Sequence, residues 1–89
     1  TGRIDILAIK KDASEYLVIE LKKGRPCDSV VGQIARYIGY IVAEVADENQ
    51  EVKGAIIALD DDLRLRRALQ VMPSVIFYRY EIQFRLTGE

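Results

Sequence analysis

Four runs of β-branched and aliphatic residues constrain the fold of this chain more than any other feature. The first two runs, residues 3–9 and 16–22, are joined by a polar segment, residues 10–15, that is typical of a hairpin turn. The first run is apolar at successive positions, which predicts a strand covered on both faces. Two later runs predict strands at residues 52–59 and 75–86.

A helical pattern follows the second strand. Asp28 or Ser29 can cap a helix that runs to about Val45. On a helical wheel, Gln33 and Tyr37 lie on a polar stripe that is separate from the apolar one. The predicted core stripe of this helix consists of aliphatic residues, namely Val31, Ile34, Ile38, Ile41, Val42 and Val45.

A shorter helix is predicted after the third strand. It begins next to the acidic run 60–62, which favours the positive end of the helix dipole, and it ends before Pro73. Its basic residues, Arg64, Arg66 and Arg67, are expected to pair with these acids on the helix surface, with contact to a polyanion as the alternative. With 89 residues the chain is too short for two separate cores. The order strand, strand, helix, strand, helix, strand therefore predicts one mixed α/β domain over residues 1–89.

The composition excludes several kinds of site. The chain has no histidine and a single cysteine, Cys27, which excludes zinc fingers, Ser-His-Asp triads and Cys-His pairs. Thirteen basic and fourteen acidic residues nearly cancel, so any contact with a polyanion must be local. Neither a long apolar run nor a signal peptide is present, which favours a cytoplasmic protein without a membrane partner.

Two carboxylates interrupt the apolar runs of the hairpin. Asp5 and Glu20 stand where an uncompensated buried charge would be costly. Glu20 and Lys22 are two residues apart, so their side chains point to the same face of the strand. If Asp5 faces the same way, two carboxylates and an ammonium group meet at one end of the sheet. Two carboxylates of this kind can bind Mg²⁺ or Mn²⁺. The bound ion and the ammonium group can then promote the hydrolysis of a phosphodiester. A solvated strand end with an ordinary ion pair is the alternative interpretation.

These residues resemble the nuclease domain of NucS/EndoMS-type endonucleases, within the PD-(D/E)XK, restriction-endonuclease-like superfamily. The resemblance lies in residues 2–7, 18–24 and 31–40, which contain an Asp, then Glu-x-Lys, then Gln-x-x-x-Tyr; the rest of the chain matches more loosely. It implies a mixed β-sheet flanked by helices, with a metal site at a split in the sheet. The implied activity is that of a metal-dependent DNA endonuclease in DNA repair.

The resemblance also implies roles for single residues. Asp5 and Glu20 would hold Mg²⁺ or Mn²⁺, with the backbone carbonyl of Leu21 as a further ligand. Lys22 would position or activate the attacking water.

Further roles fall on the helix and on basic residues. Gln33 would contact the metal-bound water or the DNA backbone, and Tyr37 would support it. The predicted DNA contacts are basic residues near this site, with an ordinary solvated loop as the alternative: Arg3, Lys23, Arg25 and Arg36.

The chain departs from the family in two respects. The superfamily core usually begins with a helix and a first strand, which we expect to be missing from this fragment. The uncovered sheet edge then favours a homodimer. A sliding clamp is an expected partner of the full-length protein only, since residues 84–89 show no such motif. The rival function is a catalytically inactive nucleic-acid-binding or dimerisation module with the same fold.

Overall fold

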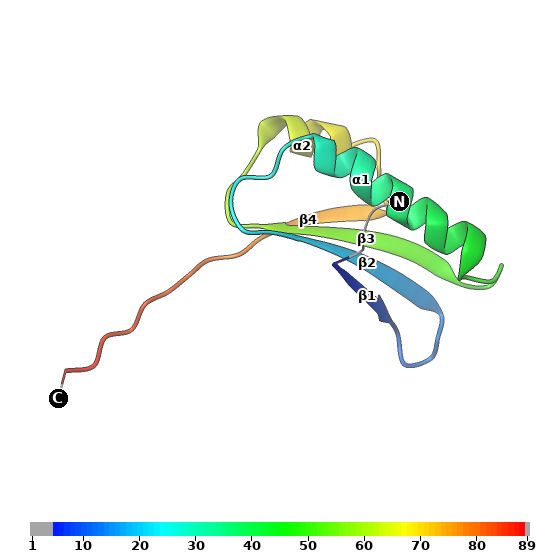
Figure 1. Ribbon diagram of the computed structural model, residues 1–89, viewed down its shortest axis with the longest axis horizontal. Coiled ribbons are helices and arrows are strands. Elements are labelled where there is room, and N and C mark those ends of the chain that lie inside the picture. The colour runs from blue at the N-terminus through cyan, green and yellow to red at the C-terminus, as the bar shows by residue number, and fades with distance from the viewer. Residues whose placement is uncertain (1–4, 89) are drawn as a thin grey trace.

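The computed structural model describes residues 5–88, and its elements follow the predicted order (Figure 1). The predicted mixed α/β fold is confirmed. The six elements are β1 (Ile6–Ile9), β2 (Glu15–Lys22), α1 (Ser29–Glu44), β3 (Glu51–Ala58), α2 (Leu63–Leu69) and β4 (Val75–Arg79).

The strands form one sheet in the order β1-β2-β3-β4. β1 and β2 form the predicted antiparallel hairpin, in which Ile6 lies opposite Ile19. β2, β3 and β4 are parallel, and Glu20, Ile56 and Phe77 lie in one row across them. Parallel neighbours require crossover connections, which α1 and α2 supply. The carboxyl ends of three strands therefore meet at one edge of the sheet.

Both helices lie on the same face of the sheet (Figure 1). The core forms between this face and α1, with fully buried residues such as Val18, Ile34 and Ile56. Gly54 allows this close approach, because a Cβ there would lie 2.9 Å from Ile34 Cδ1 and 3.2 Å from Val75 Cγ2. Neither helix within residues 5–88 is long and apolar enough to cross a membrane.

The buried face of α1 differs from the predicted one. The buried residues are Val30, Ile34, Tyr37 and Ile41, which follow a spacing of four, three and four. The prediction that Tyr37 lies on the polar stripe is therefore wrong, since this side chain is only 5% exposed. Val42 and Val45 were predicted in the core but are 57% and 42% exposed. A single sheet covers one narrow stripe of a helix: Val42 is turned about 100° from Ile41, and Val45 lies past the last helical residue.

The first strand is shorter and more exposed than predicted. β1 begins at Ile6, and residues 1–4 lie outside the part of the chain that the structure describes. Ile6, Leu7 and Ile9 are each 42–49% exposed, so the prediction of cover on both faces is wrong. The reason is that β1 is an edge strand, whereas the helices pack on β2, β3 and β4.

The last strand also ends earlier than predicted. β4 stops at Arg79, and residues 80–88 belong to no helix or strand. The Tyr80 N–H still donates to the carbonyl of Ala58, at 3.0 Å, but Ala58 is the last residue of β3. Beyond it there is no parallel neighbour, so the alternating residues Phe84 and Leu86 are 90% and 95% exposed.

The helix α2 has the predicted acidic start. The Asp62 side chain accepts from the Leu65 N–H at 2.8 Å and so caps the helix. Of the expected ion pairs only that of Arg66 with Asp61 forms. Arg64 and Arg67 have no carboxylate within 4 Å among residues 5–88, because they lie on other sides of the short helix.

Candidate active site

The carboxylate of Asp5 lies against β2 where the two hairpin strands part. The ladder between β1 and β2 ends at the pair Ile6 and Ile19. Asp5 comes next, and its Oδ2 accepts a hydrogen bond from the backbone N–H of Leu21 at 3.0 Å. This bond fixes the Asp5 carboxylate beside the backbone of the residue that follows Glu20. The predicted convergence of the Asp5 and Glu20 carboxylates themselves stays a prediction, because this bond joins Asp5 to the backbone of Leu21.

Glu20 is a buried carboxylate on the helix-covered face of β2. It is 2% exposed and is the only buried charged residue within residues 5–88. Its Oε1 lies 3.2 Å from Lys22 Nζ, and the Lys22 side chain is 34% exposed. The two residues share a face because they are two apart in a regular strand. The Lys22 ammonium group thus pairs with a buried carboxylate while part of the Lys22 side chain stays exposed to solvent.

The second oxygen of Glu20 has no hydrogen-bond partner among residues 5–88. Oε2 is buried and accepts no hydrogen bond from any described residue. A buried polar atom without a partner costs about 1–3 kcal/mol, and more when it carries charge. Such an oxygen is a suitable ligand for a hard divalent cation, which would replace the missing hydrogen bond.

The backbone beside Glu20 offers a further oxygen. In a regular strand the N–H and C=O of one residue point to the same neighbour. Because the Leu21 N–H points to Asp5, the Leu21 carbonyl faces the same side of β2. Residues 5–88 contain no group of three or more His, Cys, Asp or Glu side chains placed to hold a metal. A cation here would therefore rely on two carboxylates, this carbonyl and water or substrate oxygens.

The predicted pair on α1 forms a hydrogen bond. Gln33 Nε2 donates to the Tyr37 hydroxyl at 3.1 Å. Tyr37 is buried in the core with Val18 of β2, while Gln33 is partly exposed. Tyr37 therefore fixes the amide of Gln33 to the rigid part of the fold. No hydrogen bond within residues 5–88 joins this pair to the two carboxylates.

The predicted DNA contacts lie on two different parts of the described chain. Lys23 and Arg25 are exposed on the loop after β2, and Arg36 is exposed on α1. Arg25 Nε lies 3.8 Å from Asp62 Oδ2, at the start of α2. The remaining candidate, Arg3, lies outside the described residues.

Sequence reasoning missed Tyr80. Its hydroxyl donates to the carbonyl of Lys23 at 3.1 Å and lies 3.4 Å from that of Lys22. The hydroxyl thereby ties the chain after β4 to the end of β2, directly beyond the Glu20–Lys22 pair. No local signal could have identified it, because the partners are more than 50 residues apart.

Comparisons with known proteins bear on the fold. No protein-family model matches the chain, and no curated protein matches it. Among solved structures, a repair endonuclease from Pyrococcus abyssi superposes with a TM-score of 0.66 and 25% sequence identity. The match covers 88% of this chain and 32% of that one, so the chain spans about a third of the endonuclease. The chain is therefore similar in fold to part of a repair endonuclease.

Proposed function

We propose that this chain is the nuclease domain of a metal-dependent DNA endonuclease of the NucS/EndoMS type, within the PD-(D/E)XK superfamily, that acts in DNA repair. One observation carries the proposal. Glu20 is buried with one oxygen held by Lys22 and the other without a partner among residues 5–88, and the Asp5 carboxylate binds the backbone N–H of the next residue, Leu21. The similarity to part of a repair endonuclease supports the same activity.

Asp5, Glu20 and the Leu21 carbonyl would hold Mg²⁺ or Mn²⁺, since both ions prefer oxygen ligands. When bound, the ion would stabilise negative charge on the scissile phosphate and lower the pKa of a water. The protein contributes the placement of these oxygens. The hairpin fixes Asp5 through the Leu21 N–H, and burial fixes the Glu20 side chain.

Lys22 would position the attacking water or neutralise a phosphate oxygen. Its ammonium group is held 3.2 Å from Glu20, yet a third of the side chain remains exposed to solvent and substrate. Gln33 would contact the water or the DNA backbone with its amide. Its hydrogen bond to buried Tyr37 would keep that amide oriented without involving Tyr37 in the chemistry.

The test is Mn²⁺-dependent cleavage of a panel of labelled DNAs by the full-length protein and by its Glu20→Gln variant. The panel contains mismatched, branched, flapped and plain duplexes. We expect cleavage by the wild type and a loss of about 100-fold or more in the variant, because several kcal/mol of charge stabilisation disappear. Asp5→Asn should behave similarly. Glu51→Gln is the matched control, because Glu51 is an exposed acid of the neighbouring strand, paired with Lys53.

Two outcomes would contradict the proposal. Full cleavage by Glu20→Gln would remove Glu20 from the site. Binding of DNA without cleavage by the wild type, whatever divalent ion is added, would favour the inactive binding module. Residues 5–88 contain no group of three or more His, Cys, Asp or Glu side chains that could hold a metal, which gives that second candidate its support.

A further inference from the structure

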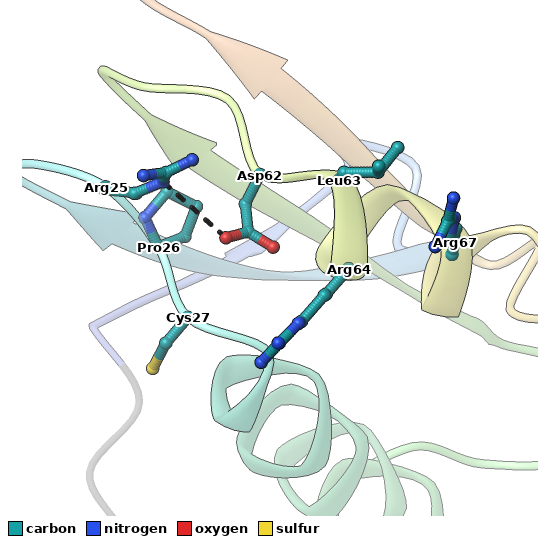
Figure 2. Close-up of a pocket in the computed structure, with 7 residues that line it drawn as sticks. All are labelled: Arg25, Pro26, Cys27, Asp62, Leu63, Arg64 and Arg67. Carbon is teal, nitrogen blue, oxygen red and sulfur yellow. Dashed lines mark ion pairs between the residues drawn. The ribbon is translucent and has the colours of Figure 1, made fainter.

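A pocket of about 520 Å³ lies between the loop after β2 and the start of α2 (Figure 2). Arg25 and Cys27 line it from the loop, and Asp62, Arg64 and Arg67 line it from the α2 side. Figure 2 shows Arg64 extending from α2 toward the first turn of α1. Segments more than 30 residues apart in the sequence thus bring three arginine residues to the lining of one cavity.

The charges in this pocket are not balanced. Asp62 is the only acid that lines it, and its carboxylate is already engaged by the Leu65 N–H and by Arg25. Arg64 and Arg67 lie more than 4 Å from every carboxylate in residues 5–88. Three positive groups against one negative group leave a formal charge of +2 at the cavity. An anionic ligand would therefore find two guanidinium groups without a partner.

The walls of the pocket are held in place by contacts outside it. The Asp60 N–H approaches the carbonyl of Gly24 at 3.5 Å, and the Tyr80 hydroxyl donates to the carbonyl of Lys23 at 3.1 Å. Pro26, at the base of the loop, is fully buried. The loop is thus fixed against β3, α2 and the chain after β4, so little ordering is needed when a ligand binds.

The pocket lies next to the candidate active site. Arg25 follows Lys22 by three residues, so their Cα atoms are at most about 11 Å apart. The same stretch of chain therefore carries the Glu20–Lys22 pair and the Arg25 wall of the pocket.

We propose that this pocket binds a backbone phosphate of the DNA substrate through Arg64 and Arg67, with Arg25 as the third basic wall. The inference rests on the proposed function for the identity of the ligand. Guanidinium groups match the geometry of phosphate through paired hydrogen bonds, and contacts of this kind set the register of a protein on DNA without reading its sequence.

The test measures binding separately from cleavage. Fluorescence anisotropy with a labelled duplex, in EDTA, compares the full-length protein with its Arg64→Gln/Arg67→Gln variant. We expect binding about tenfold weaker at low salt, and a log Kd against log salt slope smaller by about 1, as for the loss of one phosphate contact. Lys10→Gln/Lys11→Gln is the matched control, because it removes two positive charges from the hairpin turn at the opposite end of β2.

A second measurement uses the unaltered protein. Cys27 is exposed and lines the pocket, so duplex DNA should slow its alkylation by iodoacetamide at least threefold. Equal alkylation rates with and without saturating DNA, or identical DNA binding by the arginine and lysine double variants, would overturn the inference. The proposed function is judged separately by Glu20→Gln, which should bind DNA normally yet fail to cleave. The two hypotheses can therefore fail independently.

Discussion

Replacing Glu20 by glutamine should stabilise the metal-free chain and remove its response to Mn²⁺. In the wild type the buried Oε2 carries charge without any partner among the described residues. The penalty for a buried unpaired atom is about 1–3 kcal/mol for a neutral group and larger for a charged one. The glutamine amide has nearly the same shape as the carboxylate and is neutral, so the extra penalty for burying a charge disappears, while the penalty for a buried neutral polar group stays with its NH₂.

The substitution loses little of the attraction between this side chain and Lys22. Lys22 Nζ can still donate to the amide oxygen of the substituted side chain, which takes the place of the Glu20 carboxylate oxygen at 3.2 Å. The attraction that is lost is at most about 1 kcal/mol, because the Lys22 side chain is 34% exposed and its charge is hydrated. We therefore expect a net gain of about 1 kcal/mol. For 89 residues the entropy of unfolding is about 190 cal/mol/K, so the Tm should rise by about 5 °C.

With divalent ions present, the wild type should become more stable than Glu20→Gln. Mn²⁺ at about 100 times its Kd adds about 2.7 kcal/mol to a chain that binds it only when folded. The wild type should gain this amount and Glu20→Gln should not. The assay is urea denaturation followed by circular dichroism, first in EDTA and then in Mn²⁺. Glu51 is an exposed acid paired with Lys53. Its replacement by glutamine should change the free energy of unfolding by no more than about 0.5 kcal/mol, both in EDTA and in Mn²⁺.

Two results would refute this reasoning. If Glu20→Gln is less stable than the wild type in EDTA, the pair with Lys22 is a structural ion pair and the unpaired oxygen is not costly. If Mn²⁺ stabilises wild type and variant equally, the ion binds elsewhere on the chain.

Three further predictions concern the scaffold and the pocket. Gly54→Ala should destabilise the fold by about 1–3 kcal/mol in urea denaturation, because the new methyl group would lie 2.9 Å from Ile34 Cδ1; unchanged stability would contradict this packing. Ala13→Gly should stabilise the hairpin by roughly 0.5–1 kcal/mol in the same assay, since Ala13 has a φ of 61°, and a loss of stability would be inconsistent with it. The hydrogen bond from Ser29 lowers the pKa of the Cys27 thiol, so the thiolate forms at lower pH than usual. The midpoint of the pH profile of alkylation should therefore move to higher pH in Ser29→Ala; an unmoved midpoint would remove Ser29 as the cause.

Local patterns predicted the elements well where a single periodicity was present. The hairpin, the helix starting near Asp28 and the acidic start of α2 each depend on neighbours within a few residues, although the predicted side-chain cap at Asp28 does not form. The alternation that placed Glu20 and Lys22 on one face is likewise a property of the strand itself. These features were predictable because their causes are local.

Other features depended on partners far away in the sequence. Residues 80–86 continue to alternate in the manner of a strand, but β3 ends at Ala58 and leaves them nothing to pair with. Tyr37 looked polar on a helical wheel, yet the sheet beneath α1 buries its ring. In both cases the local pattern was compatible with two outcomes, and the neighbouring element selected one.

By itself the sequence determined the type and order of the elements, the placement of Glu20 and Lys22 on one face of a strand and the chemistry open to a chain without histidine. Only the tertiary structure decided that the Asp5 carboxylate accepts a hydrogen bond from the backbone beside Glu20, that one Glu20 oxygen has no partner within residues 5–88 and that Arg25, Arg64 and Arg67 share a pocket. The physical reason is that residue spacing fixes which side chains share a face of one element. Which elements meet, and which charges remain unpaired between them, is set by the packing of the whole sheet against its helices.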